Sequence, residues 1–310
     1  DLREVRGQSG AKRALEIAAT GAHSILLVGP PGSGKSMLAQ RFAGLLPPLN
    51  PDEALESAAL CSLAGRFDPQ QWGRRVQRSP HHSASAVALV GGGSPPRPGE
   101  ISLAHHGTLF LDELPEFPRA ALEALREPLE TGRVTISRAA RQAEFPARFQ
   151  LIAAMNPCPC GHLGDRSHAC RCSPEAVARY QGRLSGPLLD RIDLRVEVLS
   201  VSPQELAAAP DGESSSAIAA RVAQARALQL ERQGCPNALL NGSALDQHTA
   251  CAEAATQFLQ AAASRLGWSS RSFHRVLRVA RSVADLAGSA RIEVSHIAEA
   301  IQLRRALPGR

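Results

Sequence analysis

Residues 25–36 read Ile-Leu-Leu-Val-Gly-Pro-Pro-Gly-Ser-Gly-Lys-Ser, and this stretch decides the fold. Its last eight residues have the spacing of a phosphate-binding loop: a glycine, four residues, then Gly-Lys-Ser. The apolar run His23–Val28 predicts a buried strand before the loop, and the pattern over Lys35–Leu46 predicts a helix after it. Glycines let backbone N–H groups surround phosphates at a helix N-terminus. The alternative is a glycine-rich turn that binds nothing. The residues expected to hold a nucleotide are Gly29, Pro30, Pro31, Gly32, Ser33, Gly34, Lys35, Ser36 and Met37.

Two side chains of this loop have expected roles, and a second apolar run supplies their partners. Lys35 would reach the β- and γ-phosphates, and the Ser36 hydroxyl would take a Mg²⁺ position. Residues 108–111 predict a strand that ends in Asp112 and Glu113. We expect Asp112 to hold Mg²⁺ directly or through water, and Glu113 to act as general base on the hydrolytic water. The alternative is an acidic cap on the helix expected over Leu114–Leu125.

A third apolar run, residues 150–154, predicts a strand close before Asn156. The amide could hydrogen-bond the γ-phosphate or orient the attacking water. The alternative is a turn-forming Asn before Pro157. Since the three strands alternate with helical patterns, and residues 193–199 add a fourth, the sequence predicts a mostly parallel α/β sheet.

A change of composition divides the chain. Residues 207–216 read AAAPDGESSS, which is typical of a linker, and every later segment has a helical pattern. We expect an ATPase-type core over 1–206 and an all-helical domain over 217–310. Four helices are predicted there, the last with Ser295 as its N-cap: Ala217–Gln233, Ala252–Leu266, Ser270–Leu286 and Val294–Arg305.

Composition bounds the function only loosely. The 310 residues are 44% hydrophobic and 21% charged, which excludes a disordered or collagen-like chain. No apolar run is long enough to cross a bilayer. The net charge is +6, and all but two of the 35 basic residues are arginines, the exceptions being Lys12 and Lys35. Basicity alone is weak support for a nucleic-acid partner, because codon composition can produce it. The chain starts without Met or a signal peptide, so we expect a cytoplasmic protein and a piece of a longer one.

Four cysteines crowd one segment directly after Asn156. The spacing is Cys158-x-Cys160, nine residues, then Cys170-x-Cys172. In a reducing compartment this set suits a tetrahedral, structural Zn²⁺. The gap of one residue within each pair is tighter than usual, and His162 or His168 could replace a thiolate. Free cysteines or disulfides are the alternatives.

Several segments together resemble an AAA+ ATPase. Val5-Arg6-Gly7-Gln8 resembles the segment on the adenine side of the nucleotide, residues 185–194 resemble the stretch with the arginine finger, and 269–281 resemble the sensor-2 helix. The match is narrower still, and covers essentially the whole chain, for the ComM/YifB group of magnesium-chelatase-like AAA+ proteins. The segments that carry it are PHHSAS at 80–85, LVGGG at 89–93, PGEISLAH at 98–105 and NPCPCG at 156–161.

The resemblance implies roles for further residues. Val5 and Gln8 would contact the adenine side, Arg191 would be the finger inserted into a neighbouring subunit's nucleotide, and Arg271 would be the sensor-2 arginine acting in cis. A guanidinium offsets charge on the γ-phosphoryl group, and supplying it in trans ties hydrolysis to assembly. From the residues alone, an ion pair of Arg191 with Asp190 or Asp193, or a solvated cation at Arg271, are the alternatives.

The substrate is the least determined feature. Residues 90–101 predict a loop or hairpin, and Arg133–Arg138 predicts a strand of a second hairpin. In ring ATPases similar to this chain such hairpins grip DNA, where Arg133, Arg138 and Arg141 would neutralise phosphates; a solvated basic hairpin is the alternative. The resemblance implies a hexameric DNA helicase that promotes branch migration in natural transformation, and an added N-terminal domain resembling part of Lon protease. A magnesium-chelatase or chaperone-like remodelling ATPase, and a nucleotide-gated binding module, are the competing functions.

Overall fold

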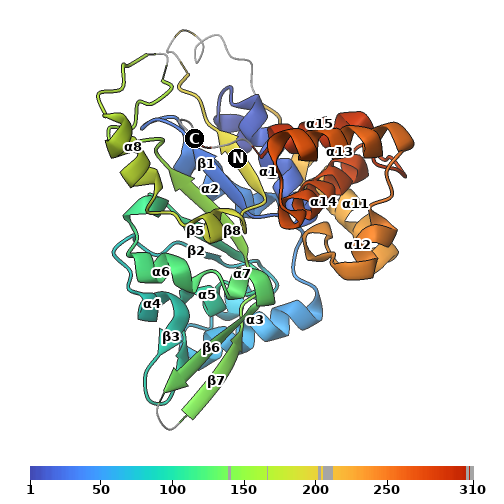
Figure 1. Cartoon of the computed structure of the whole chain (residues 1–310). Coiled ribbons are helices and arrows are strands. Elements are labelled where there is room, and N and C mark those ends of the chain that lie inside the picture. The colour runs from blue at the N-terminus through green and yellow to red at the C-terminus, as the bar shows by residue number, and fades with distance from the viewer. Residues whose placement is uncertain (139–140, 166, 202–203, 205–211, 305–306, 308–310) are drawn as a thin grey trace.

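Five parallel strands form the central sheet of the computed structural model, in the order β2-β5-β8-β1-β9. The structure describes residues 1–138, 141–165, 167–201, 204, 212–304 and 307. The sheet lies at the centre of the chain, with helices on both of its faces (Figure 1). The predicted parallel α/β sheet is therefore confirmed. Its strands are β1 (Ile25–Val28), β2 (Gln77–Arg78), β5 (Thr108–Leu111), β8 (Gln150–Met155) and β9 (Leu194–Glu197).

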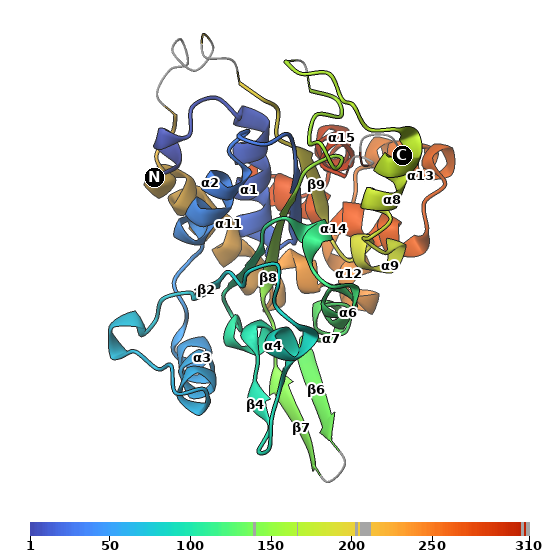
Figure 2. The ribbon, with the colours of Figure 1, turned by 90° about the vertical axis from the view of Figure 1, so that its left-hand side faces the viewer.

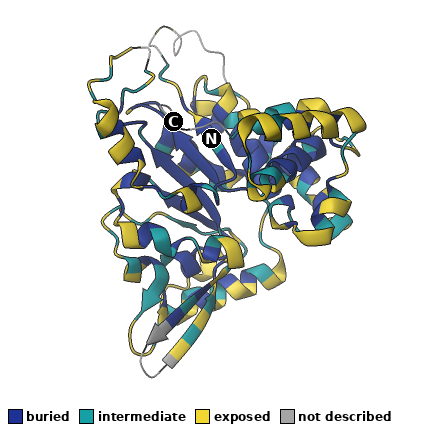
Figure 3. Cartoon of the chain, in the orientation of Figure 1, coloured by how far each residue is buried: buried dark blue, intermediate teal, exposed yellow. Residues whose placement is uncertain are grey.

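The strands divide their side chains between two hydrophobic cores. In β1, Ile25 and Leu27 belong to one core and Leu26 and Val28 to the other, as the alternation of a strand requires. All four residues of β1 are buried, which explains why the run is apolar without alternation (Figure 3). The helices of this part of the chain are α1 (Ser9–Gly21), α2 (Lys35–Phe42), α3 (Pro51–Leu63), α4 (Ala86–Val90), α5 (Glu100–Leu103), α6 (Arg119–Ala124), α7 (Pro128–Thr131), α8 (Pro174–Gln181) and α9 (Gly186–Leu189).

The C-terminal part is helical, as expected. Its first helix, α11, packs against α1, and α14 packs against both, so this part shares one core with the sheet. The first half of the predicted linker, residues 207–211, lies outside the described residues, and its last two residues, Ser215 and Ser216, already belong to α11. The predicted Ser295 N-cap is wrong: Glu293 caps the last helix, in a reciprocal capping box with His296. The helices are α11 (Ser215–Gln233), α12 (Gly242–His248), α13 (Glu253–Leu266), α14 (Ser270–Leu286) and α15 (Val294–Gln302).

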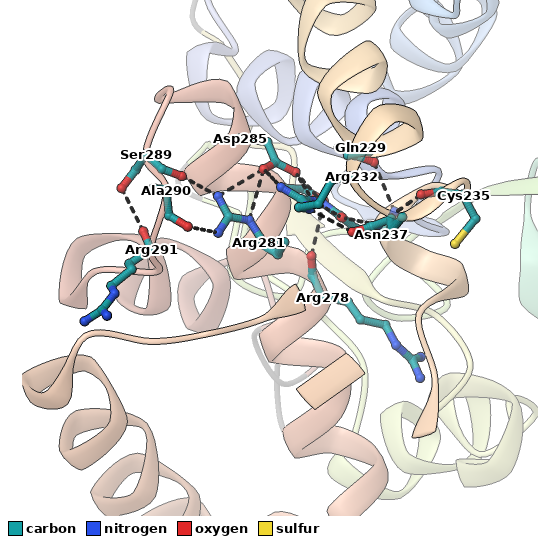
Figure 4. A network of polar contacts seen from close by, with 12 residues as sticks. Gln229, Arg232, Cys235, Asn237, Arg278, Arg281, Asp285, Ser289, Ala290 and Arg291 are labelled. Atoms are coloured by element: carbon teal, nitrogen blue, oxygen red, sulfur yellow. Dashed lines mark hydrogen bonds and ion pairs between the residues drawn. The ribbon is translucent and has the colours of Figure 1, made fainter. Parts of the chain in front are cut away.

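A buried polar network holds these C-terminal helices together (Figure 4). The Asp285 carboxylate accepts hydrogen bonds from Arg232 at 2.7 Å, from Asn237 at 2.8 Å and from Arg281 at 3.0 Å. Arg281 also donates to the Ala290 carbonyl at 2.9 Å, and its side chain is 2% exposed. Because a buried charge is tolerated only when it is paired, this arginine has a structural role.

Two hairpins extend from the amino ends of the strands, side by side (Figures 1 and 2). One pairs β3 (Gly91–Gly92) with β4 (Arg97–Pro98), and the other pairs β6 (Arg133–Arg138) with β7 (Arg141–Pro146). The second was predicted from its β-formers, and the Gly and Pro residues of 90–101 predicted a loop or a hairpin for the first. They touch: a methyl group added to Gly91 would meet Ile136 Cδ1 at 2.9 Å.

Helix α3 belongs to the same end of the molecule and covers a pair of histidines before β5. His105 is 2% exposed; its Nδ1 accepts the Arg148 N–H at 2.9 Å and its Nε2 lies 3.0 Å from the Glu56 carboxylate. Burial lowers the pKa of His105 to about 4, although Glu56 opposes the shift. No helix among the described residues is long and apolar enough to cross a membrane.

Candidate nucleotide-binding site

The predicted phosphate loop runs from the carboxyl end of β1 into the N-terminus of α2. Gly34 stands at the N-cap with φ 92°, a conformation that L side chains rarely adopt. The Lys35 ammonium donates to the carbonyls of Gly29 and Pro30, both at 2.8 Å, and to Asn156 Oδ1 at 3.2 Å. Burial lowers the pKa of Lys35, and the nearby Asp112 charge opposes this. The structure thus brings Lys35 and Asn156 together. Lys35 begins the helix that follows β1, and Asn156 directly follows the neighbouring strand β8.

The acidic pair after β5 reaches the same edge of the sheet. The Ser36 hydroxyl donates to the Asp112 carboxylate at 2.6 Å. A hydroxyl and a carboxylate oxygen are hard ligands that suit Mg²⁺. Glu113 follows in a left-handed backbone conformation with φ 51°, and its N–H donates to the Asp112 carboxylate at 2.9 Å. Its carboxylate lies 2.9 Å from His82 Nδ1, a contact that no motif in the sequence indicated.

The remaining residues expected to contact the nucleotide, Val5, Gln8 and Met37, differ in their contacts and burial. Gln8 Nε2 donates to the carbonyls of Ser33 at 3.1 Å and Leu199 at 2.7 Å, so it joins the phosphate loop to the segment after β9. Val5 is buried, whereas Met37 is 44% exposed.

The four clustered cysteines converge beside this site. The Sγ atoms of Cys158, Cys160 and Cys170 are 3.5–3.7 Å apart, and all four Sγ atoms lie within 4.8 Å of one another. With Zn–S bonds of about 2.3 Å, a tetrahedral ion holds its sulfurs roughly 3.8 Å apart. The donor set and its size therefore fit Zn²⁺. The two histidines of this loop do not join the thiols; they face Asp165, with His162 Nδ1 at 3.0 Å and His168 Nδ1 at 3.4 Å from its carboxylate.

The cysteine loop packs against the phosphate loop. A Cβ added to Gly161, which has φ 85°, would meet Pro31 Cδ at 2.5 Å and Asn156 Cγ at 3.8 Å. The Gln181 amide of α8 donates to the Pro157 carbonyl at 2.9 Å and closes the loop from the other side. The cysteine loop therefore forms one side of the candidate nucleotide site.

The two arginines expected to act on a nucleotide share one carboxylate. Arg191 and Arg271 both donate to Glu130 of α7, Arg271 at 3.2 Å. Within the described part of the chain Arg191 pairs with neither Asp190 nor Asp193, and Asp193 binds Arg275 of α14 instead. Arg191 precedes the amino end of β9, whereas the phosphate loop follows the carboxyl end of β1, which is parallel to β9. Arg271 thus lies with Arg191, which precedes the amino end of β9, and this arrangement favours a shared role of the two arginines over the cis role predicted for Arg271.

The structure describes the backbone of the β6–β7 hairpin except at residues 139–140, and it describes the side chains nearest α7. Arg133 is 62% exposed and pairs with Glu144 at 2.5 Å. Arg138 closes β6 and pairs in register with Arg141, the first residue of β7. The side chains of these two arginines lie outside the described residues.

Known proteins resemble this chain over nearly its whole length. Residues 1–206 match the family model of magnesium chelatase, subunit ChlI, and residues 212–304 match that of the ChlI C-terminal part. The chain is 49% identical to the competence protein ComM of Haemophilus influenzae and 50% identical to the uncharacterized protein YifB of Escherichia coli, over 98% of its own length in both comparisons. It spans about 60% of the length of these curated relatives. A more distant match, 28% identical over 134 residues, covers 43% of the chain and 14% of the maternal DNA replication licensing factor mcm3 of Xenopus laevis.

Proposed function

The chain belongs to the magnesium chelatase ChlI family of AAA+ proteins, in its ComM/YifB group, and on that premise we propose that it is an ATP-hydrolysing ring motor that acts on DNA. The observation that carries the ATPase part is the meeting of Lys35, Ser36, Asp112 and Asn156 at one edge of the sheet. Mg²⁺ bound there would neutralise charge on the transferred phosphoryl group. Lys35 would hold the phosphates, Asp112 and Ser36 would orient each other at the metal position, and Glu113 would take the proton of the attacking water.

We further propose that both Arg191 and Arg271 serve the nucleotide of a neighbouring subunit. They lie together at the amino ends of the strands, on the side opposite to their own phosphate loop. Active sites would then form only between subunits, in a ring that we propose to be a hexamer. The arginine charge offsets the charge that develops on the γ-phosphoryl group.

DNA is the substrate that we propose for the motor. The β6–β7 hairpin carries Arg133 and ends its strands on Arg138 and Arg141, and the chain has a net charge of +6. Neutralising phosphates in this way recognises the backbone and not the sequence. The likeness to a replication licensing factor and the likeness to a competence protein support the proposal. We propose that the motor promotes branch migration of DNA taken up in natural transformation, in the cytoplasm. We also propose that the four clustered cysteines hold a structural Zn²⁺.

A second function is favoured by the family match itself. Members named for magnesium chelatase point to a motor that remodels a protein partner or drives metal insertion into a porphyrin. The two functions differ in one measurable property: DNA should stimulate ATP hydrolysis only by a DNA motor.

The test is the rate of ATP hydrolysis with no DNA, with single-stranded DNA and with a four-way junction. We expect both DNAs to bind and to raise turnover. Glu113→Gln should bind ATP normally and lose at least about a hundredfold in turnover, the usual contribution of a general base. Unchanged turnover in Glu113→Gln would refute the catalytic assignment. Hydrolysis that no DNA stimulates, by a protein that no DNA binds, would refute the DNA motor and favour the remodelling function.

A further inference from the structure

Glu130 binds two arginines from distant parts of the chain. Its Oε2 accepts from Arg191, which lies between α9 and β9, and its Oε1 accepts from Arg271 at 3.2 Å, in the first turn of α14. Both contacts are charge-assisted, the stronger class of hydrogen bond. The Arg191 contact lowers the pKa of Glu130, so the carboxylate stays ionised.

Both terminal nitrogens of the Arg191 guanidinium donate hydrogen bonds within the chain. Its side chain is 9% exposed, its other terminal nitrogen donates to the Pro187 carbonyl at 2.8 Å, and its Nε is buried with no hydrogen-bond partner. A guanidinium in this position cannot also reach out to a neighbour's phosphate. It must first leave Glu130, which is half exposed and lies on the solvent side of the pair.

Glu130 stands at the foot of the β6–β7 hairpin, three residues before Arg133. The foot is tied to the hairpin by two hydrogen bonds. Thr135 Oγ1 of β6 donates to the Glu127 carboxylate at 3.1 Å, and the Ala147 N–H after β7 donates to the Gly132 carbonyl at 2.8 Å. Gly132, the C-cap of α7, donates its N–H to the Pro128 carbonyl and is followed directly by β6, so that α7 and the hairpin are joined without an intervening loop. A displacement of the hairpin therefore displaces Glu130.

We propose that Glu130 is a positioning residue that couples the hairpin to the arginine pair: it holds Arg191 and Arg271 back until DNA moves the hairpin. The inference rests on the proposed DNA-motor function, and it explains how occupation of the hairpin reaches a nucleotide at the far side of a subunit interface. Glu130 touches no phosphate itself. It competes with the neighbour's γ-phosphate for the same two guanidinium groups.

The test compares Glu130→Gln with Glu123→Gln in the whole chain. Glu123 of α6 pairs with Arg126 at 2.6 Å and hydrogen-bonds Ser185, a bond that a glutamine can keep. Among the described residues it contacts neither Arg191 nor Arg271, so it controls for the loss of one ion pair. We expect Glu130→Gln to raise DNA-free turnover about fivefold, the low end of ordinary coupling between sites, and to lower the ratio of DNA-stimulated to DNA-free turnover by the same factor. Glu123→Gln should match the wild-type chain in both. Glu130→Asp, which keeps the carboxylate, should restore most of the ratio.

Three results would overturn the coupling: DNA-free turnover in Glu130→Gln equal to that of Glu123→Gln, a lower one, or a raised one with the DNA ratio unchanged. If DNA stimulates no variant, the DNA motor fails but the DNA-free comparison still decides whether Glu130 restrains the arginines. If the chain does not hydrolyse ATP, ring assembly replaces turnover as the readout and is measured by sedimentation of Glu113→Gln in the presence of ATP. The double variant Glu113→Gln/Glu130→Gln should then be half-assembled at a protein concentration about fivefold lower than that of Glu113→Gln alone. Equal concentrations would refute the restraint.

Discussion

Replacing Gly161 by alanine should weaken nucleotide binding, although Gly161 is not itself among the residues expected to contact the nucleotide. The added Cβ would lie 2.5 Å from Pro31 Cδ and 2.7 Å from Pro31 Cγ. Ordinary van der Waals contact for such an atom is 3.4–4 Å. The proline ring is rigid and part of the phosphate loop, so the loop or the cysteine segment must move by about 1 Å. A misplacement of that size can cost about a hundredfold where groups must be held in register.

A matched control separates this clash from backbone strain. Gly164 belongs to the same cysteine loop and also has a left-handed backbone, with φ 80° against 85° for Gly161. A Cβ there would find only Glu197 Oε1, at 3.9 Å. The left-handed backbone should cost both substitutions about 1 kcal/mol in the free energy of unfolding, and the clash with Pro31 should add to that cost only in Gly161→Ala. Only Gly161→Ala should also lower nucleotide affinity, by about ten- to a hundredfold.

The assay is equilibrium binding of a fluorescent ATP analogue, with urea unfolding of both variants as the measure of stability. Binding of the analogue does not require hydrolysis, DNA or a ring, so the result bears on the contact between the two loops alone. Equal nucleotide affinities in Gly161→Ala and Gly164→Ala would refute the reasoning. The cysteine loop would then be a neighbour of the site and not part of its wall.

Three further predictions follow from the same geometry. Turnover per subunit should rise with protein concentration in the wild-type chain and stay low and flat in Arg191→Ala; a wild-type rate independent of concentration would exclude a finger in trans. Zinc analysis should find about one ion per chain, lost in Cys170→Ser and kept in Cys61→Ser, since structural sites use four protein ligands. The free energy of unfolding should fall by up to about 3 kcal/mol as the pH drops from 6.5 to 4, because unfolded His105 takes up a proton that the folded state excludes; urea unfolding of His105→Gln should lack this part of the slope.

The elements around the phosphate loop were predictable because their signals are local. An apolar run, a glycine-rich turn and a helical pattern are adjacent in the chain over residues 23–46, and the strand before Asp112 ends in its own acidic pair. The two hairpins also have local signals in the sequence: Gly and Pro residues over 90–101, and β-formers over 133–138. The short helix α12 and the helix α3 were not predicted, because neither has a strong apolar periodicity that separates it from a loop.

The contacts that carry the proposals were not predictable, because they join residues far apart in sequence. Glu130 meets Arg191 and Arg271 at separations of 61 and 141 residues. His82 meets Glu113 only because the segment after β2 passes beside the end of β5. Charged residues are common on any surface, so a sequence offers many equally good partners for each. Tertiary structure chooses among them.

The four arginines of α14 show how tertiary contacts bear on whether Arg271 serves its own nucleotide or that of a neighbouring subunit. Arg281 is absorbed into the buried network with Asp285, and Arg275 pairs with Asp193, which is 6% exposed. Burial by itself would raise the pKa of Asp193, but Arg275 and His23 together hold it well below its usual range. Breaking a buried pair of this kind costs about 3–5 kcal/mol. Helix α14 is thereby fixed to the amino end of β9, and Arg271, one turn before Arg275, is fixed with it. Swinging Arg271 to its own phosphate loop would break that pair, whereas a neighbour's nucleotide can approach Arg191 and Arg271 with α14 left in place.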